Sequence, residues 1–105
     1  MAETKELVII GGPNGSGKTT FTQSYVELHP MACLNADEIA KDINPENVSK
    51  VSVTAGKIFF QRLEQYKARG ESILIESTLS GTYLTKMMDE FHKDGYDVTL
   101  VYVFL

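Results

Sequence analysis

The 105-residue sequence predicts a single α/β domain in which helices cover both faces of a parallel sheet. Apolar segments rich in β-branched residues alternate with segments of helical periodicity along the whole chain. The segments at residues 73–75 and 98–105 are almost continuously apolar, which is typical of strands covered on both faces. A glycine-rich turn joins the first apolar segment to the first helical one, as in a βα unit that binds phosphate.

The predicted helices end at residues that disfavour helix. Pro30 ends the first helix, since proline disfavours helix in the residue before it, and Pro45 follows the second. Gly70 and Gly95 lie where C-terminal caps belong. In chain order, we expect strands at residues 6–10, 31–35, 72–76 and 97–105, and helices at residues 17–28, 35–42, 49–69 and 82–93.

The three longer helices are expected to pack one apolar face against the sheet. Apolar side chains that recur every three or four residues fall on one side of a helix. The set in the last helix is interpreted as packing against the sheet rather than binding a base. The predicted faces are Phe21, Tyr25 and Leu28 in the first helix, Ala55, Ile58, Phe59, Leu63 and Tyr66 in the long helix, and Tyr83, Met87, Met88 and Phe91 in the last.

The composition is that of a soluble globular protein, with 43% hydrophobic and 23% charged residues. The net charge of −4 offers no basic surface for nucleic acid and no attraction to an anionic membrane. We see no signal-peptide core and no apolar segment as long as a membrane span. The single cysteine, Cys33, excludes an internal disulfide and is expected to be a buried structural thiol. We therefore expect a cytoplasmic protein.

The glycine-rich turn carries the motif G-x-x-x-x-G-K-[ST], with Gly12, Gly17, Lys18 and Thr19 at its fixed positions. Glycines let backbone N–H groups point at an anion, and the following helix adds the positive end of its dipole. In this motif the lysine reaches the β- and γ-phosphates, and the threonine hydroxyl ligates Mg²⁺. The alternative is a flexible turn before an ordinary helix, but the strand before it and the helix after it favour binding of ATP or GTP with Mg²⁺. The predicted nucleotide-binding residues are Gly12, Pro13, Asn14, Gly15, Ser16, Gly17, Lys18, Thr19 and Thr20.

Two carboxylates follow strands that are expected to end beside this loop. Asp37 follows the second strand and Glu76 ends the third. Phosphoryl transfer needs a group that orients or deprotonates the attacking hydroxyl, and Asp37 is the candidate for this role. It also needs a carboxylate that helps to hold Mg²⁺, and Glu76, together with the Thr19 hydroxyl, is the candidate for that role. The alternatives are a helix N-cap role for Asp37 and a solvated strand end for Glu76. Thr78 and Ser80 are candidates for binding phosphate or substrate hydroxyls, and Ser80 alternatively caps the next helix.

Other polar residues are expected to lie outside the site. Arg62 and Arg69 are the only arginines, and both fall on the long helix, away from the predicted crevice. No arginine is therefore placed to stabilise charge on a transferring phosphoryl group. His29 and His92 have no partner at ligand spacing and are expected on the surface.

The last predicted strand, at residues 97–105, reaches the end of the chain with no helix after it. We therefore expect residues 1–105 to be the N-terminal part of a longer kinase-like domain, truncated at its C-terminus. We also expect this strand to be an exposed edge that pairs with a second copy of the chain.

Three sequence blocks resemble the zeta-toxin family of P-loop kinases, in particular its chromosomal bacterial branch. They are GPNGSGKT at residues 12–19, NADEIA at residues 35–40 and ESTLSG at residues 76–81. With Gly95-Tyr96-x-Val98 they extend the resemblance over nearly the whole chain. It implies a fold like that of small nucleotide kinases and phosphorylation of the 3′-hydroxyl of the amino sugar in UDP-N-acetylglucosamine. It also implies ATP or GTP with Mg²⁺ as cofactors and a small antitoxin protein as partner.

The resemblance also implies residue roles. Asp37 would be the catalytic base, Lys18 and Thr19 would bind the phosphates and Mg²⁺, and Glu76 and Thr78 would lie near the substrate. The sequence departs from the family at two points. Characterised toxins have a glutamate that helps to bind the sugar nucleotide where this chain has Phe60 or a neighbouring residue. They also continue past the equivalent of residue 105 with a further strand and an arginine-bearing lid.

These observations predict a kinase that uses ATP or GTP to phosphorylate a small molecule, with a UDP-N-acetyl amino sugar as the acceptor that the resemblance implies. A nucleotide-binding module or slow ATPase without phosphotransfer is the first alternative. An inactive fragment that retains only the fold is the second.

Overall fold

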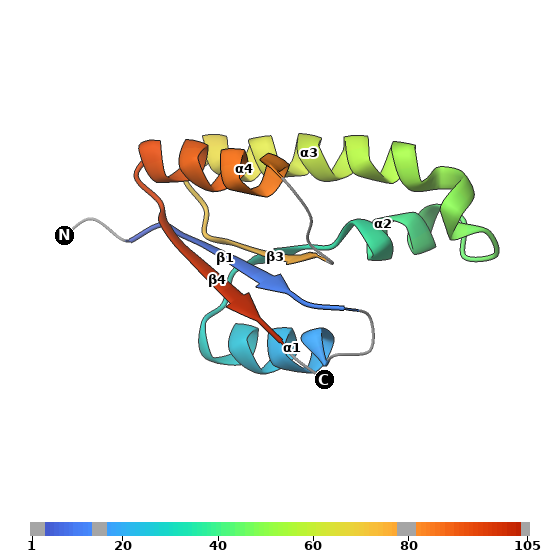
Figure 1. The fold of residues 1–105 in the computed structure, drawn as a ribbon, viewed down its shortest axis with the longest axis horizontal. Helices are drawn as coiled ribbons and strands as arrows, with labels where there is room; N and C mark the ends of the chain where they lie inside the picture. The colour runs from blue at the N-terminus through green and yellow to red at the C-terminus, as the bar shows by residue number, and fades with distance from the viewer. Residues whose placement is uncertain (1–3, 14–16, 78–81, 104–105) are drawn as a thin grey trace.

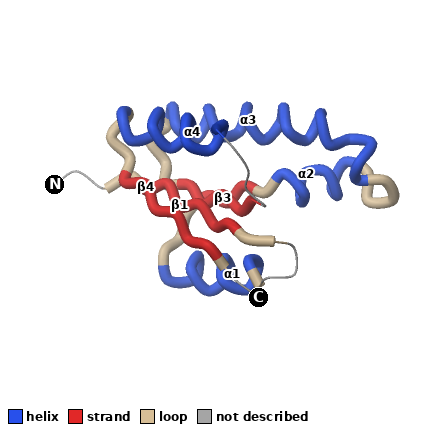
Figure 2. Tube along the Cα trace, viewed as in Figure 1, coloured by secondary structure: helices blue, strands red, loops and turns tan. Residues whose placement is uncertain are grey.

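The computed structural model describes residues 4–13, 17–77 and 82–103. Four parallel strands form one sheet in the order β2-β3-β1-β4. Helices lie on both faces of the sheet, α1 on one side and α3 and α4 on the other (Figures 1 and 2), which confirms the predicted α/β P-loop fold. None of the helices in the described ranges is long and apolar enough to cross a membrane. In chain order the elements are β1 (Glu6–Gly11), α1 (Lys18–Leu28), β2 (Ala32–Leu34), α2 (Ala36–Ile43), the 3₁₀ turn η1 (Val48–Val51), α3 (Ser52–Ala68), β3 (Ile73–Ser77), α4 (Thr82–Lys93) and β4 (Asp97–Tyr102).

Strand β1 lies inside the sheet, and its neighbours determine where a ligand can bind. Leu7 of β1 is in register with Ile73 of β3 on one side and with Val98 of β4 on the other. After β1 the chain enters α1 below the sheet, whereas after β3 it enters α4 above it (Figure 1). In a parallel sheet, strands whose connections diverge in this way leave a crevice at their carboxyl ends, and ligands bind there.

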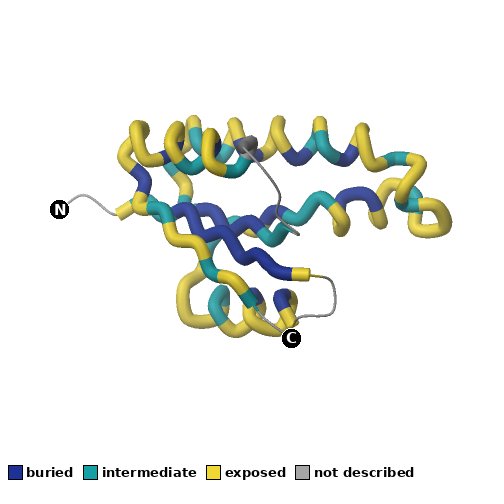
Figure 3. The backbone as a smooth tube through the Cα atoms, viewed as in Figure 1, coloured by how far each residue is buried: buried dark blue, intermediate teal, exposed yellow. Residues whose placement is uncertain are grey.

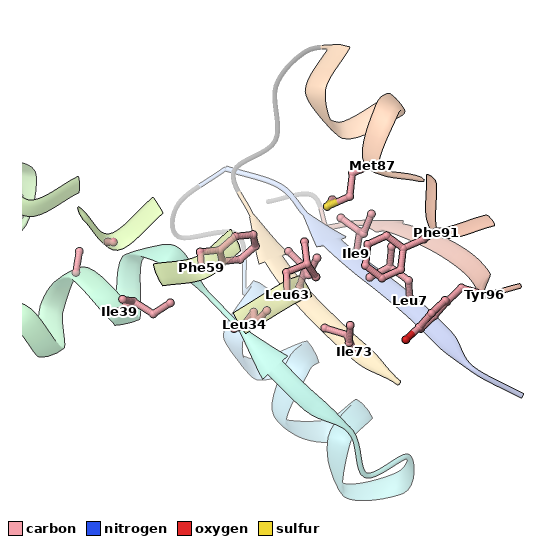
Figure 4. Packing of buried hydrophobic residues seen from close by; sticks show 13 residues of the cluster. Leu7, Ile9, Leu34, Ile39, Phe59, Leu63, Ile73, Met87, Phe91 and Tyr96 are labelled. Carbon is pink, nitrogen blue, oxygen red and sulfur yellow. The ribbon is translucent and has the colours of Figure 1, made fainter. Parts of the chain in front are cut away.

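Side chains of β1 fill two apolar cores, because successive residues of a strand point to opposite faces. Leu7 and Ile9 face the larger core under α3 and α4 (Figure 4), and Val8 and Ile10 face α1. All four are at most 1% exposed. Burial of one such side chain contributes about 1.5–3 kcal/mol, so β1 holds both helical layers to the sheet. The predicted face of α3 is confirmed by Ala55, Phe59 and Leu63, which are buried, and by Ile58 and Tyr66, which are partly buried. That of α4 is confirmed for Met87 and Phe91, which are buried, and Met88, which is partly buried, whereas the side chain of Tyr83 lies outside the described residues.

Tyr96 closes the end of the sheet opposite the crevice. Its hydroxyl donates a hydrogen bond to the carbonyl of Glu71 at 2.8 Å, and the Lys5 ammonium lies 4.7 Å from its ring centroid. Gly70 and Gly95 end α3 and α4 with φ of 70° and 90°, a left-handed conformation that favours glycine, so both predicted caps are confirmed.

The predicted apolar face of α1 is wrong in part. Phe21 is 36% exposed and Leu28 is 78% exposed. The glycine turn sets the rotation of α1 about its axis so that Lys18 faces inward, and residues one and two turns later then face the sheet. The residues of α1 that are buried or packed against the sheet are Lys18, Thr22, Tyr25 and Val26.

Both edges of the sheet are more exposed than the sequence predicted. Strand β4 is mostly exposed (Figure 3), with Leu100 at 46% and Tyr102 at 50%, so the prediction that it is covered on both faces is wrong. The prediction that it forms an edge of the sheet is confirmed, although residues 104–105 lie outside the described ranges. At the other edge, Cys33 is exposed rather than buried, because it lies in β2, which among the described strands is paired only with β3.

Candidate active site

The carboxyl ends of the strands open onto a cleft of about 320 Å³, which we call the phosphate cleft. Three parts of the chain that are distant in sequence form its walls, namely the first turn of α1, helix α2 with its N-cap, and the end of β3. Its lining residues are Gly17, Lys18, Thr19, Thr20, Asn35, Asp37, Glu38, Lys41, Glu76 and Ser77.

The two helices that begin at this cleft differ in whether a side chain accepts hydrogen bonds from their first N–H groups. Gly17 precedes α1 with φ of 91°, no described side chain caps this helix, and its first turn contains no acidic residue. In α2, by contrast, the Asn35 side chain accepts hydrogen bonds from the N–H groups of Asp37 at 2.9 Å and Glu38 at 3.4 Å. The first turn of α1 therefore offers N–H donors and the positive end of its dipole to an anion in the cleft, whereas α2 does not.

Lys18 is held at the point where β1 and β3 diverge. It is only 8% exposed, and its ammonium donates to the carbonyl of Gly12 at 2.7 Å and to that of Ser77 at 3.5 Å. These bonds place a positive charge between the ends of the two strands. Since an ammonium has three donors on a flexible stem, Lys18 can also bond to a phosphate in the cleft that it lines.

Thr19 and Glu76 form a contact between α1 and β3. The Thr19 hydroxyl donates a hydrogen bond to Oε1 of Glu76 at 3.0 Å. Hydroxyl and carboxylate oxygens suit Mg²⁺, which proteins usually hold by one or two carboxylates together with substrate phosphates. Within the described ranges, no group of three or more His, Cys, Asp or Glu residues could hold a metal on its own. The Thr19–Glu76 pair therefore fits an ion that takes its remaining ligands from the nucleotide and water.

Asp37 lies in the first turn of α2 and lines the phosphate cleft. The N-cap role that the sequence left open for it is wrong, because Asn35 is the N-cap. The exposed Asp37 carboxylate makes no hydrogen bond or ion pair with another described residue, so it is available to a ligand.

Lys41 is a lining residue that the sequence analysis missed. It lies one helical turn after Asp37, and the four-residue spacing of the pair is the signal that could have found it. Its ammonium is 3.5 Å from Oε1 of Glu38, with the two side chains 58% and 64% exposed. An ion pair this exposed contributes about 0–1 kcal/mol, so Lys41 can exchange it for a ligand at little cost.

The prediction that both arginines lie away from the crevice agrees with the phosphate cleft, since neither arginine is among its described lining residues. Arg62 nevertheless lies nearby. It lines a second cavity, of about 440 Å³, that shares Thr19 and Glu76 with the phosphate cleft. Arg69 does lie elsewhere, 3.8 Å from a carboxylate oxygen of Glu71 at the end of α3. Arg62 reaches the site through the packing of α3 on α2, which no local sequence pattern reveals.

The remaining predicted site residues are partly described. Thr20 lines the phosphate cleft, and Pro13 is exposed beside the buried Gly12. His29 and His92 are exposed, as predicted. The candidates that lie outside the described residues are Asn14, Gly15, Ser16, Thr78 and Ser80.

Comparisons with known proteins concern the family and the fold of the chain. A family model described as an AAA domain matches residues 7–105. An uncharacterized protein of Haemophilus influenzae is 32% identical over 99 residues, which are 88% of this chain and 65% of that protein.

Solved structures share the fold at low sequence identity. The PezAT chromosomal toxin–antitoxin system of Streptococcus pneumoniae matches with a TM-score of 0.82 and 21% identity, over 96% of this chain and 47% of that chain. A Chloroflexus aurantiacus protein described as a candidate kinase matches with a TM-score of 0.78 and 20% identity, over 98% and 61%. The Pnkp1/Rnl/Hen1 complex matches with a TM-score of 0.79 and 17% identity, over 100% and 37%. The chain thus spans less than two thirds of the length of each of these relatives.

Proposed function

This chain belongs to the AAA domain family, and on that premise we propose that it is a P-loop kinase. It would transfer the γ-phosphate of ATP or GTP to a hydroxyl group of a small molecule. The observation that carries the proposal is the contact between Thr19 and Glu76, at 3.0 Å, in one cleft with Lys18 and Asp37. A cleft that only bound phosphate would need the loop, whereas phosphoryl transfer also needs a metal-directing carboxylate and a base.

In this mechanism the nucleotide phosphates lie against the first turn of α1. The N–H groups of that turn and the Lys18 ammonium stabilise negative charge on the phosphates. Thr19 and Glu76 would hold Mg²⁺, which neutralises charge that develops on the transferring phosphoryl group. Asp37 accepts the proton of the acceptor hydroxyl as its oxygen bonds to the γ-phosphorus and the bond to the leaving nucleoside diphosphate breaks.

A zeta-toxin type of kinase is the finer form of this proposal. It is supported by the fold shared with PezAT and by the strand-end positions of Asp37 and Glu76. On this proposal the acceptor to test first is UDP-N-acetylglucosamine, Thr78 lies near it, and a small antitoxin protein binds the chain in the cytoplasm. A polynucleotide acceptor is less favoured, because the net charge of −4 repels a polyanion.

A nucleotide-binding module or slow ATPase is the second candidate. It is favoured by the absence of arginine among the described residues that line the phosphate cleft, since an arginine accounts for a large share of the rate in many phosphoryl-transfer enzymes. In that case the chain would bind ATP·Mg²⁺ and transfer phosphate only to water. An inactive fragment would bind nucleotide weakly or not at all.

The first test is calorimetric binding of ATP·Mg²⁺ to the chain, to a Lys18→Ala variant and to a Lys57→Ala control. Lys57 is exposed on α3 and lines neither cavity, so its loss should leave binding unchanged. Binding that is lost only in Lys18→Ala supports a working phosphate loop. Equal binding by all three proteins, or none, would refute nucleotide binding at this cleft.

The second test separates a kinase from a binding module. Asp37→Asn removes the base without changing the size of the side chain, and Asp89→Asn on the exposed face of α4 is its control. A kinase loses phosphotransfer to its acceptor, by about 10²–10⁴-fold, and keeps ATP affinity. An unchanged rate in Asp37→Asn would assign the base elsewhere.

A further inference from the structure

Strand β4 (Asp97–Tyr102) is an edge strand of the sheet. Among the described strands it is paired only with β1, and the opposite edge of the sheet is the three-residue strand β2. Proteins commonly protect an edge strand by keeping it very short, as with β2, or by placing proline or charged residues on it. Residues 98–105 contain no proline and no charged residue. The β4 edge therefore lacks these protections and can accept a further strand.

The backbone of β4 determines which residues can bond to that further strand. The N–H of Asp97 donates to the carbonyl of Lys5, and the N–H of Val103 donates to the last carbonyl of β1, each at 2.8 Å. Successive residues of a strand direct their N–H and C=O groups to opposite sides, so the odd-numbered residues of β4 bond on the β1 side. The N–H and C=O groups of Val98 and Leu100 consequently point away from β1, towards the edge.

The side chains that accompany these groups are apolar. Val98 packs against the core under α3 and α4, and Leu100 and Tyr102 lie on the same face of β4, because side chains alternate along a strand. Leu100 is 46% exposed and Tyr102 is 50% exposed (Figure 3). A strand laid beside β4 would cover both side chains while it bonds to the backbone.

We propose that β4 pairs in antiparallel orientation with β4 of a second copy of this chain, centred on Leu100, so that the two sheets become one. In such a pair, residues that exchange backbone hydrogen bonds oppose each other and direct their side chains to the same face. Even-numbered residues therefore oppose even-numbered ones, which places Leu100 opposite Leu100 of the second copy and Val98 opposite Tyr102 of the second copy. Aliphatic pairs and aromatic–β-branched pairs of this kind stabilise a sheet.

A second copy fits this edge because one register serves both chains at once, as a two-fold interface requires. Asp97 is the single charged residue of β4, and in this register it lies at the end of the ladder, away from Asp97 of the second copy. Like charges therefore do not oppose each other across the paired strands.

This pairing leaves the two phosphate clefts apart. The paired β4 strands run in opposite directions, so their carboxyl ends point to opposite ends of the joined sheet. The cleft residues Lys18 and Glu76 belong to α1 and β3, not to the pairing strand. Self-pairing through β4 is therefore independent of nucleotide binding and does not rest on the proposed kinase function.

The test is sedimentation velocity of the chain over about 1–500 µM, which spans the Kd expected for a small interface. Stable, specific interfaces bury about 1,200–2,000 Å², more than two six-residue strands supply, so we expect a weak dimer with a Kd on the order of 10–100 µM. Leu100→Lys places two like charges opposite each other at the centre of the pair and should raise the Kd about five- to tenfold. Val53→Lys is the matched control, because Val53 is 73% exposed on α3, away from β4, and its replacement should leave the Kd unchanged.

A second measurement tests the register and does not depend on the lysine variant. In a Cys33→Ser background, which removes the single native thiol, Leu100→Cys should be crosslinked to a covalent dimer by a short bismaleimide, because the two thiols oppose each other. Val53→Cys in the same background carries an exposed thiol away from the edge and should yield at least about fivefold less crosslinked dimer.

The outcomes separate this inference from the proposed function. A monomer at every concentration would overturn the pairing, and so would equal dimerisation of Leu100→Lys and the unchanged chain or equal crosslinking of the two thiol variants. Association beyond the dimer would also contradict it, because a two-fold pair uses the same edge of both copies and is closed. A dimer that is lost only in Leu100→Lys, in a protein that binds no ATP·Mg²⁺, would support the pairing and refute the kinase.

Discussion

Replacement of Thr22 by valine should stabilise the protein. The Thr22 hydroxyl is buried and has no partner among the described residues, and such a group costs about 1–3 kcal/mol. Threonine and valine differ little in helix propensity, so removal of the hydroxyl dominates the change. We expect Thr22→Val to raise the free energy of unfolding by about 1 kcal/mol, the lower end of this range. For a domain of this size that corresponds to a rise in Tm of about 4–8 °C.

Thermal and urea denaturation of Thr22→Val and of a Thr85→Val control provide the measurement. Thr85 is exposed on α4, where the same substitution should change the free energy of unfolding by no more than about 0.5 kcal/mol. Loss of stability in Thr22→Val would mean that the hydroxyl has a partner in solution, and the reasoning would be refuted.

Three further predictions concern other parts of the molecule. Gly56→Ala should raise the free energy of unfolding, measured by urea denaturation, by about 0.5–1 kcal/mol, because a Cβ there meets no atom within 4 Å and alanine favours helix. Gly70→Ala should lower the free energy of unfolding, because φ at this position is 70°. Equal effects at the two glycines would contradict the structure. Tyr96→Phe should lower the free energy of unfolding by about 0.5–1.5 kcal/mol, since it removes the 2.8 Å hydrogen bond from the tyrosine hydroxyl to the carbonyl of Glu71. An unchanged free energy of unfolding would mean that water replaces this bond. The raised pKa of Cys33 should displace the midpoint of its alkylation–pH profile above that of a free thiol, and Glu76→Gln should lower this midpoint. Because the unfolded chain loses this proton at a lower pH, the Cys33 contribution to stability is fully present below the unfolded pKa and is lost as the pH rises through the folded pKa. An unchanged midpoint in Glu76→Gln would exclude the electrostatic contribution.

The sequence predicted the fold because its signals are local and agree with one another. The strand before Gly12, the helix after Gly17 and the breaks at Gly70 and Gly95 are each encoded by a few adjacent residues, and all four are found in the structure. The parallel sheet followed from the alternation of elements, since a parallel strand pair requires a crossover between its members. The juxtaposition of Asp37, at the start of α2, with the end of β3 followed from the rule that the carboxyl ends of parallel strands meet at one edge.

What the sequence did not reveal depends on how elements are rotated and packed. The apolar periodicity of α1 indicated a face around Phe21, but the glycine turn fixes Lys18 inward and so turns Thr22 to the interior. Cys33 has apolar neighbours in sequence, yet it lies on an edge strand where one side has no partner strand. Arg62 reaches the second cavity only because α3 packs on α2, which is a contact between elements rather than a pattern within one.

The position of Glu76 suggests how one carboxylate can serve both cavities. On one side it accepts the hydrogen bond of Thr19 at 3.0 Å, and on the other it borders the adjoining cavity of about 440 Å³ and lies close enough to Cys33 to raise the pKa of that thiol. A cation bound at Thr19 would offset the charge of Glu76 and so lower the pKa of the Cys33 thiol. Nucleotide with Mg²⁺ should therefore lower the midpoint of the alkylation–pH profile of Cys33. A midpoint that is unaffected by the nucleotide would show that Glu76 does not link the two cavities.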